Sequence, residues 1–200
     1  MDRITSIALR IAGTAGAASE EGERYEGFTG GIRYHGTDAD VRDATFTLKD
    51  GKVIWEEGTW LSGTWDGGIW KSGTWVSGTW NRGVWKYGVW KGDGGKKDVW
   101  HRGTWEKGTW MDGTWEDGVW KYGFWKNGTW ENGKWMSGAW NGGTWKGGVH
   151  ADGQWYGGKF DGGSWEDGVW MGDNEKWLKG DWKNGRDAEG KSHSDDPSRW

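Results

Sequence analysis

Large aromatic residues recur at every fifth position through most of the chain. Trp occupies each fifth position from Trp55 to Trp90 and from Trp100 to Trp145, and continues at Trp155, Trp165 and Trp170. Two mostly polar residues, a glycine and a mostly β-branched residue separate successive Trp. In an extended strand, residues five apart point to opposite faces, so a turn is needed in every pentad to bring the Trp to one side. The pattern predicts a repeat protein of short strands joined by corners.

Glycine fits the requirement for a corner because it adopts positive φ without strain. The residue before Trp is usually Thr, Val or Ile, which favour extended backbone. Each pentad is therefore expected to be a short strand followed by a turn. The turn residues that we assign are Gly63, Gly68, Gly73, Gly108, Gly113 and Gly118.

Two architectures satisfy this pattern. In a β-solenoid, about four pentads form one coil of roughly 20 residues, and residues 55–170 form about six coils, a rod of roughly 30 Å with every Trp inside. In a meander ribbon, the Asn-Gly and Asp-Gly pairs form hairpin turns, and the Trp form a stripe that faces water unless a partner covers it. We favour the solenoid. The expected core residues are Trp60, Trp65, Trp70, Trp75, Trp80, Trp105, Trp110, Trp115, Trp120, Trp125 and Trp130.

The stretch ADVRDATFTL at residues 39–48 contains two pentads with a small residue two positions before Val or Phe. It resembles the pentapeptide-repeat family, which implies a right-handed square β-helix. Aligning Ala44 and Phe46 with Gly58 and Trp60 shows that the small inward residue shrinks as its large neighbour grows, as constant packing volume requires. The resemblance lies in period and size over most of residues 39–185, whereas Trp departs from that family's Leu-rich consensus. The segment WLKGDWKNGRDAEG at 177–190 resembles the hairpin repeats of the MORN family and supports the ribbon.

The chain divides into four expected segments. Residues 1–38 lack the period and are predicted to form a short helical or irregular N-terminal cap or attachment segment; residues 1–19 read either as a secretory signal or as an amphipathic helix bearing Ile4, Ile7, Ala8 and Ile11. Residues 39–54 are lead-in pentads with a hairpin at Asp50-Gly51, residues 55–185 are the Trp solenoid, and residues 186–200 are a polar flexible tail. Between Trp90 and Trp100 the phase is kept but one Trp is missing, which predicts an outward loop.

Composition limits the classes of function. The formal charge of −4 with interspersed signs indicates no nucleic-acid-binding face, and zero Cys excludes disulfides and thiolate chemistry. No apolar run approaches the roughly 20 residues of a membrane span. A DNA-mimic role, known among pentapeptide-repeat proteins, fits poorly because Lys and Arg interrupt the acidic residues.

The sequence contains no pattern of residues that is typical of a catalytic or metal-binding site. The four histidines are scattered, and His150, at a Trp position, reads as a core variant rather than a ligand. Ser192, His193 and Asp195 are the residue types of a catalytic triad. They lie next to one another in the expected flexible tail, which cannot hold the geometry of a triad. The GDGG at 92–95 resembles calcium-binding glycine/aspartate repeats in a single copy only. We expect no enzyme activity, no cofactor and no metal.

The sequence therefore favours a non-enzymatic structural module, a rigid β-rod that acts through protein–protein contacts. Protein partners would bind the N-terminal segment, in homo- or hetero-oligomers. The near-perfect Gly-x-Trp repeat is similar to uncharacterised repeat proteins of tailed bacteriophages, which implies a virion or tail component. The alternative is a carbohydrate or cell-surface recognition module that uses aromatic platforms, which requires exposed rings. Nothing in the sequence specifies a compartment.

Overall fold

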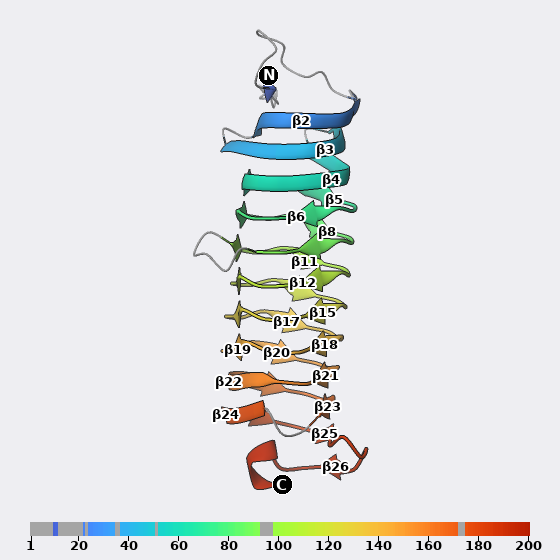
Figure 1. The fold of residues 1–200 in the computed structure, drawn as a ribbon. Coiled ribbons are helices and arrows are strands. Elements are labelled where there is room, and N and C mark those ends of the chain that lie inside the picture. Colours follow the sequence, from blue (N-terminus) through green and yellow to red (C-terminus); the bar gives the residue numbers. More distant parts are fainter. Residues whose placement is uncertain are drawn as a thin grey trace, which may run out of the picture.

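The protein is a straight rod of stacked strands in the computed structural model (Figure 1). The structure describes residues 10–11, 22, 24–34, 37–50, 52–92, 98–171 and 175–200. These residues form an all-β solenoid of about eight turns, and the only helical element among them is the 3₁₀ turn η1 (Pro197–Arg199). The predicted β-solenoid is confirmed, and the meander ribbon is excluded because the Trp strands pair in parallel.

Most coils contain three pentads, and the expectation of about four pentads and a square cross-section is wrong. Trp55 pairs with Trp70, Trp60 with Trp75, and Trp65 with Trp80, so each of these Trp meets the one that follows three pentads later. The cross-section is therefore three-sided. The physical reason lies at the centre of the coil, where indoles from neighbouring sides meet edge to face: the ring centroids of Trp60 and Trp65 are 5.7 Å apart with planes at 75°. Three such rings fill the interior, whereas a fourth side would widen it and leave a void.

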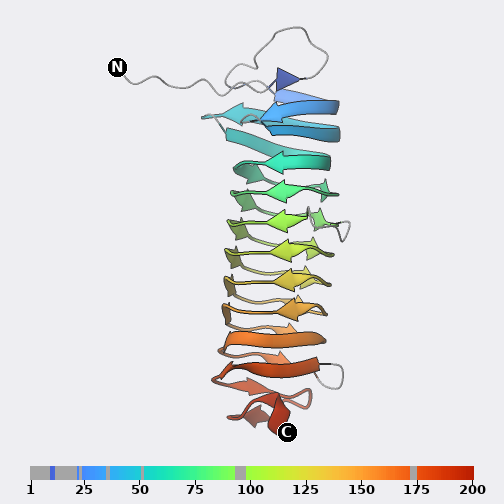
Figure 2. The same ribbon diagram turned by 90° about the vertical axis from the view of Figure 1, so that its left-hand side faces the viewer.

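Three columns of strands run along the rod, and we call them the first, second and third faces (Figure 2). All begin in β4 (Lys52–Trp65). The first face continues through β5 (Gly68–Trp70), β8 (Val84–Trp85), β11 (Thr104–Trp105), β14 (Val119–Trp120), β17 (Lys134–Trp135), β20 (Val149–His150), the end of β22 (Gly158–Trp165) and the end of β24 (Glu175–Trp182).

The other two faces have the same construction. The second face contains β6 (Thr74–Trp75), β9 (Val89–Trp90), β12 (Thr109–Trp110), β15 (Phe124–Trp125), β18 (Ala139–Trp140), β21 (Gln154–Trp155), β23 (Val169–Trp170) and β25 (Gly185–Arg186). The third face contains β7 (Thr79–Trp80), β10 (Val99–Trp100), β13 (Thr114–Trp115), β16 (Thr129–Trp130), β19 (Thr144–Trp145) and the beginnings of β22 and β24.

In the described part of the chain, antiparallel strands close the N-terminal end of the rod. β1 (Arg10–Ile11), β2 (Arg24–Tyr34), β3 (Thr37–Lys49) and β4 form an antiparallel succession. The predicted hairpin is present, since Lys49 pairs with Lys52 and Asp50 has a φ of 50°. Across this hairpin Phe46 pairs with Trp55, and its ring extends the first face's stack. Within the described part of residues 1–38 the predicted helical cap is therefore β-strand, and the helix positions before residue 10 lie outside the described residues.

The insertion between Trp90 and Trp100 lengthens one coil without disturbing the core. Trp100 pairs with Trp80, so this coil spans the length of four pentads instead of three. The rings of Trp90 and Trp100 are 6.2 Å apart at 71°, the same arrangement as rings separated by a single pentad. The predicted loop at 93–97 lies outside the described residues. At its end Asp98 takes a glycine position, is fully buried, and accepts a hydrogen bond from the Gly78 backbone N at 2.9 Å.

Residues 186–200, expected from composition to form a flexible tail, make defined contacts at the C-terminal end. β25 pairs with β26 (Ser192–His193) in antiparallel fashion, and η1 follows. The Trp200 ring stacks on His193 at 3.8 Å and meets Trp182 edge to face. Trp200 lies 18 residues after Trp182, beyond the last pentad, so the repeat pattern did not indicate that it packs on the last coil.

Candidate functional site

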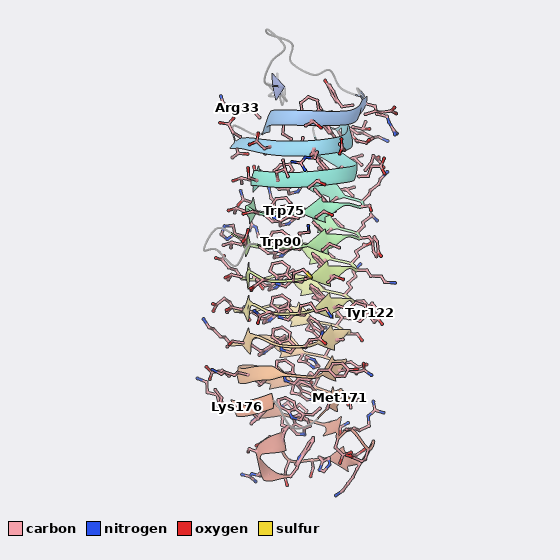
Figure 3. All side chains as sticks on the ribbon, viewed as in Figure 1. Arg33, Trp75, Trp90, Tyr122, Met171 and Lys176 are labelled. Atoms are coloured by element: carbon pink, nitrogen blue, oxygen red, sulfur yellow. The ribbon has the colours of Figure 1, made fainter. Side chains whose placement is uncertain are left out.

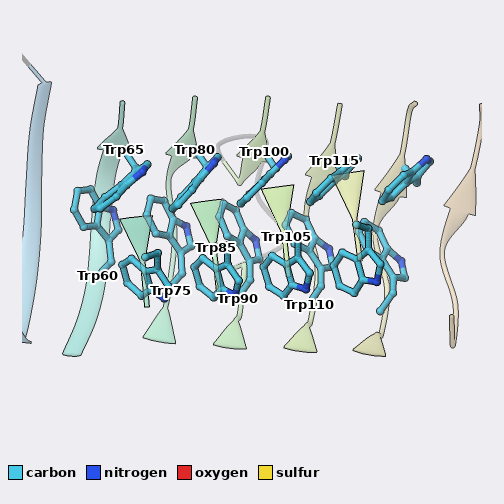
Figure 4. Close-up of a cluster of buried hydrophobic side chains, with 14 of the residues drawn as sticks. Trp60, Trp65, Trp75, Trp80, Trp85, Trp90, Trp100, Trp105, Trp110 and Trp115 are labelled. Carbon is cyan, nitrogen blue, oxygen red and sulfur yellow. The ribbon is translucent and has the colours of Figure 1, made fainter. Parts of the chain in front are cut away.

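The repeated Trp form a continuous aromatic interior. Each of the eleven Trp that the sequence assigned to the core is fully buried. Within a face the rings stack: Trp105 and Trp120 are 4.7 Å apart with planes 5° apart. Between faces they meet edge to face, as Trp100 and Trp105 do at 6.0 Å and 73° (Figure 4). These rings are therefore structural, and no ligand can reach them.

The glycine of each pentad allows successive coils to approach closely. The six assigned turn glycines all have positive φ, between 111° and 140°. At Gly118 a Cβ atom would lie 2.4 Å from the Gly103 carbonyl oxygen of the coil before it. That carbonyl accepts a hydrogen bond from the Val119 N at 2.9 Å, and Trp105 O accepts from Lys121 N at 2.8 Å. Glycine is thus required both for φ and for the coil spacing.

His150 replaces a Trp in the first face and is fully buried. Its ring lies between Trp135 at 6.0 Å and Trp165 at 3.8 Å. Neither ring nitrogen has a hydrogen-bond partner of normal geometry within the described residues. Burial lowers the pKa of His150 to about 3, and the backbone of Asp167 acts weakly in the opposite direction. The ring is a neutral member of the core stack, in agreement with the interpretation of His150 as a core variant.

The other described histidines, the exposed His101 and the partly buried His193, pair with carboxylates. His101 Nδ1 is 2.6 Å from Glu116 Oε2, and His193 Nε2 is 2.8 Å from Asp187 Oδ2. The hydrogen bond from His193 lowers the pKa of Asp187. His193 is therefore paired with Asp187 and not with its neighbours Ser192 and Asp195. No described residues form a group of three or more His, Cys, Asp or Glu suited to a metal ion, and no helix in the described chain is long and apolar enough to cross a membrane.

The charged residues of the pentads form ladders between coils. Lys71 pairs with Glu56 at 2.8 Å, and Lys146 with Glu131 at 2.8 Å, each between equivalent positions of successive coils. Glu106 lies between Lys86 at 3.7 Å and Lys121 at 3.4 Å. These pairs are exposed and contribute little to stability each. The sequence interpretation of these positions as a solvated coil surface agrees with their exposure.

The exposed aromatic residues are distributed unevenly. Between β4 and β23 the exposed rings in the described chain are Tyr87, Tyr122, Phe124 and Tyr156, and all four lie on the second face or at its edge. Tyr122 projects outward from the rod, whereas Trp75 and Trp90 point inward (Figure 3). The sequence pattern did not reveal this asymmetry, because outward residues can be assigned to a face only when the number of pentads per coil is known.

No protein-family model, curated protein or solved structure matches this chain. The description of this protein therefore rests on its own sequence and geometry, and the resemblance to pentapeptide repeats extends to a coiled β architecture with a five-residue repeat.

Proposed function

We propose that this chain is a non-enzymatic structural module, a stiff rod that acts through protein–protein contacts. The observation that carries this proposal is the set of three aromatic columns through the described coils, interrupted only by substitutions such as His150 and Phe160. Every coil is joined to the next by stacked rings and by backbone hydrogen bonds of 2.7 to 3.2 Å between pentads. Bending the rod would separate rings on one side, so the stack resists it.

The rod is longer than the sequence suggested because its coils are smaller. About eight turns, each rising about 4.8 Å, give a repeat region of roughly 40 Å. The antiparallel strands at one end and the β25–β26 hairpin at the other cover the terminal Trp layers. Capped ends favour a rod of fixed length over open-ended stacking, as a spacer requires.

We place the attachment of protein partners at the N-terminal segment, residues 1–38. The similarity of the Gly-x-Trp repeat to proteins of tailed bacteriophages supports a tail or virion part as the setting. The carbohydrate-binding alternative, in the form that uses Trp platforms, has no support from the Trp of the core, because those rings are buried.

Electron microscopy tests the structural role. The purified full-length chain should give straight particles of a single length, and a broad distribution of lengths or bent particles would contradict a rigid spacer. In particles assembled in the native host, a gold label at the C-terminus should lie at a constant distance from the particle surface.

A deletion series tests the attachment. A chain that lacks residues 1–21 should keep the rod but lose incorporation into particles, because those residues precede the first long strand, β2. The matched control lacks residues 93–97, whose removal keeps the five-residue phase of the repeat, and should still be incorporated. Equal incorporation of both variants would contradict attachment through the N-terminal segment.

A further inference from the structure

The second face has an outer surface of three columns in three successive coils. Register places Tyr87, Lys107 and Tyr122 in one column, because each follows by two residues a Trp of the first face that pairs with the next. Val89, Thr109 and Phe124 form the middle column, and Lys91, Met111 and Lys126 follow the paired Trp90, Trp110 and Trp125. Successive coils are about 4.8 Å apart, so the two tyrosines lie roughly 10 Å apart along the rod.

This surface combines exposed aromatic rings with positive charge. Tyr87 is 56% exposed, Tyr122 48% and Phe124 49%. Lys91, Lys107 and Lys126 are exposed and form no ion pair with another described residue. Lys107 Nζ lies 5.8 Å from the centre of the Tyr122 ring. No acidic residue occupies any of the nine positions.

The positive surface has clear ends. In the column that contains Tyr87, Glu57 lies two coils toward the N-terminus, and Asp152 and Asp167 lie in coils toward the C-terminus. The whole chain has a formal charge of −4, whereas these nine positions carry three lysines and no acidic residue, so an anionic ligand is attracted here. The surface is short, about three coils, which suits an oligomeric segment of a polymer lying along the rod axis.

We propose that Tyr87, Lys91, Lys107, Tyr122, Phe124 and Lys126, which we call the lysine–tyrosine face, bind an acidic polysaccharide. The flat rings provide stacking platforms for sugar rings, and the lysines bind the carboxylate or sulfate groups. In an extended β-linked polysaccharide, alternate sugars present the same side, so platforms two coils apart meet every second sugar. Met111 and Val89 provide apolar contact between the platforms.

A single-stranded nucleic acid fits this surface less well. Bases in a stacked strand recur about every 3.4 Å, far closer than the roughly 10 Å between the tyrosines. The proposal adds a binding site to the rod and does not depend on its structural role.

Binding of fluorescently labelled oligomannuronate, a β-linked chain of uronic acids, to the full-length protein tests the proposal. We expect saturable binding that weakens as salt rises. Replacing Tyr122→Ala or Lys107→Gln should each weaken binding by roughly tenfold. Lys134→Gln is the matched control, since Lys134 is an exposed lysine at a middle-column position of the first face, and its affinity should stay within about twofold.

Each contrary result would overturn the proposal. These results are the absence of oligomannuronate binding, equal losses for Lys107→Gln and Lys134→Gln, and an unchanged affinity for Tyr122→Ala. Tighter binding of oligothymidylate would identify a single-stranded nucleic acid instead, and tighter binding of polyglutamate would identify an acidic peptide. Equal binding of the neutral cellohexaose would exclude a role for the lysines. Thermal melting of each variant checks that the rod remains folded.

Discussion

The ring of His150 stacks on Trp165 with centroids 3.8 Å apart, closer than the Trp pairs that precede it in the first face, such as Trp120 and Trp135 at 4.8 Å. A small ring thus replaces an indole, and the Trp of the next coil lies against it. The imidazole sits where no water can solvate a positive charge. The aromatic core of this rod therefore contains a titratable group.

The stability of the rod should fall as the pH falls from about 6.5 to about 3. The folded His150 has a pKa of about 3, against 6.5 for the unperturbed side chain, so the unfolded chain binds the proton first. Within this window the free energy of unfolding should fall by about 1.4 kcal/mol per pH unit. Urea unfolding of the protein and of His150→Phe, at pH 7 and pH 5, measures the difference. An equal pH dependence of the two proteins would show that His150 does not titrate on unfolding.

Replacing Trp120→Ala should lower the free energy of unfolding by about 3 to 5 kcal/mol, because it leaves a cavity in the interior. Trp120 stacks on Trp105 at 4.7 Å and Trp135 at 4.8 Å, so both contacts are lost. Lys121→Ala, the next residue on the outside, should cost less than about 1 kcal/mol. A loss below about 1 kcal/mol for Trp120→Ala, measured by denaturant unfolding, would contradict an interior role.

Replacing Gly118→Ala should destabilise the rod by at least about 3 kcal/mol, since positive φ and a steric clash add. Its φ is 127°, and a Cβ would meet the Gly103 carbonyl oxygen at 2.4 Å. Gly190→Ala separates the two effects, because Gly190 has a φ of 81° but nothing within 4 Å of an added Cβ. It should cost only about 1 kcal/mol. Similar melting temperatures for the two variants would show that coil spacing does not require glycine.

Removing residues 93–97 should leave the fold and its stability nearly unchanged, within about 1 kcal/mol. The remaining segment Trp90-Lys-Gly-Asp-Val-Trp100 is a regular pentad, and the rings of Trp90 and Trp100 already lie as neighbours at 6.2 Å. Removing residues 121–123 instead would break the five-residue phase and should prevent folding. Circular dichroism and melting of both deletions measure this contrast, and unfolding of the first would show that the inserted residues support the coil.

The sequence alone determined the local rules of this protein. A Trp at every fifth position, with a glycine two residues before it, specifies a short strand, a corner and an inward ring, and each pentad carries that information by itself. The Asp50-Gly51 hairpin is equally local. The burial of His150 followed from its phase.

Only the tertiary structure decided how many pentads close a coil, because three or four similar pentads have the same repeat. The choice depends on how indoles such as Trp60 and Trp65 pack across the centre, a contact between sides of the coil. That number then decides which outward residues become neighbours. Tyr87 and Lys107 are neighbours in one column because the inserted residues lengthen one coil by a pentad. Lys107 and Tyr122 are neighbours in the same column because the next coil again has three pentads. The lysine–tyrosine face can therefore be recognised only when both coil lengths are known.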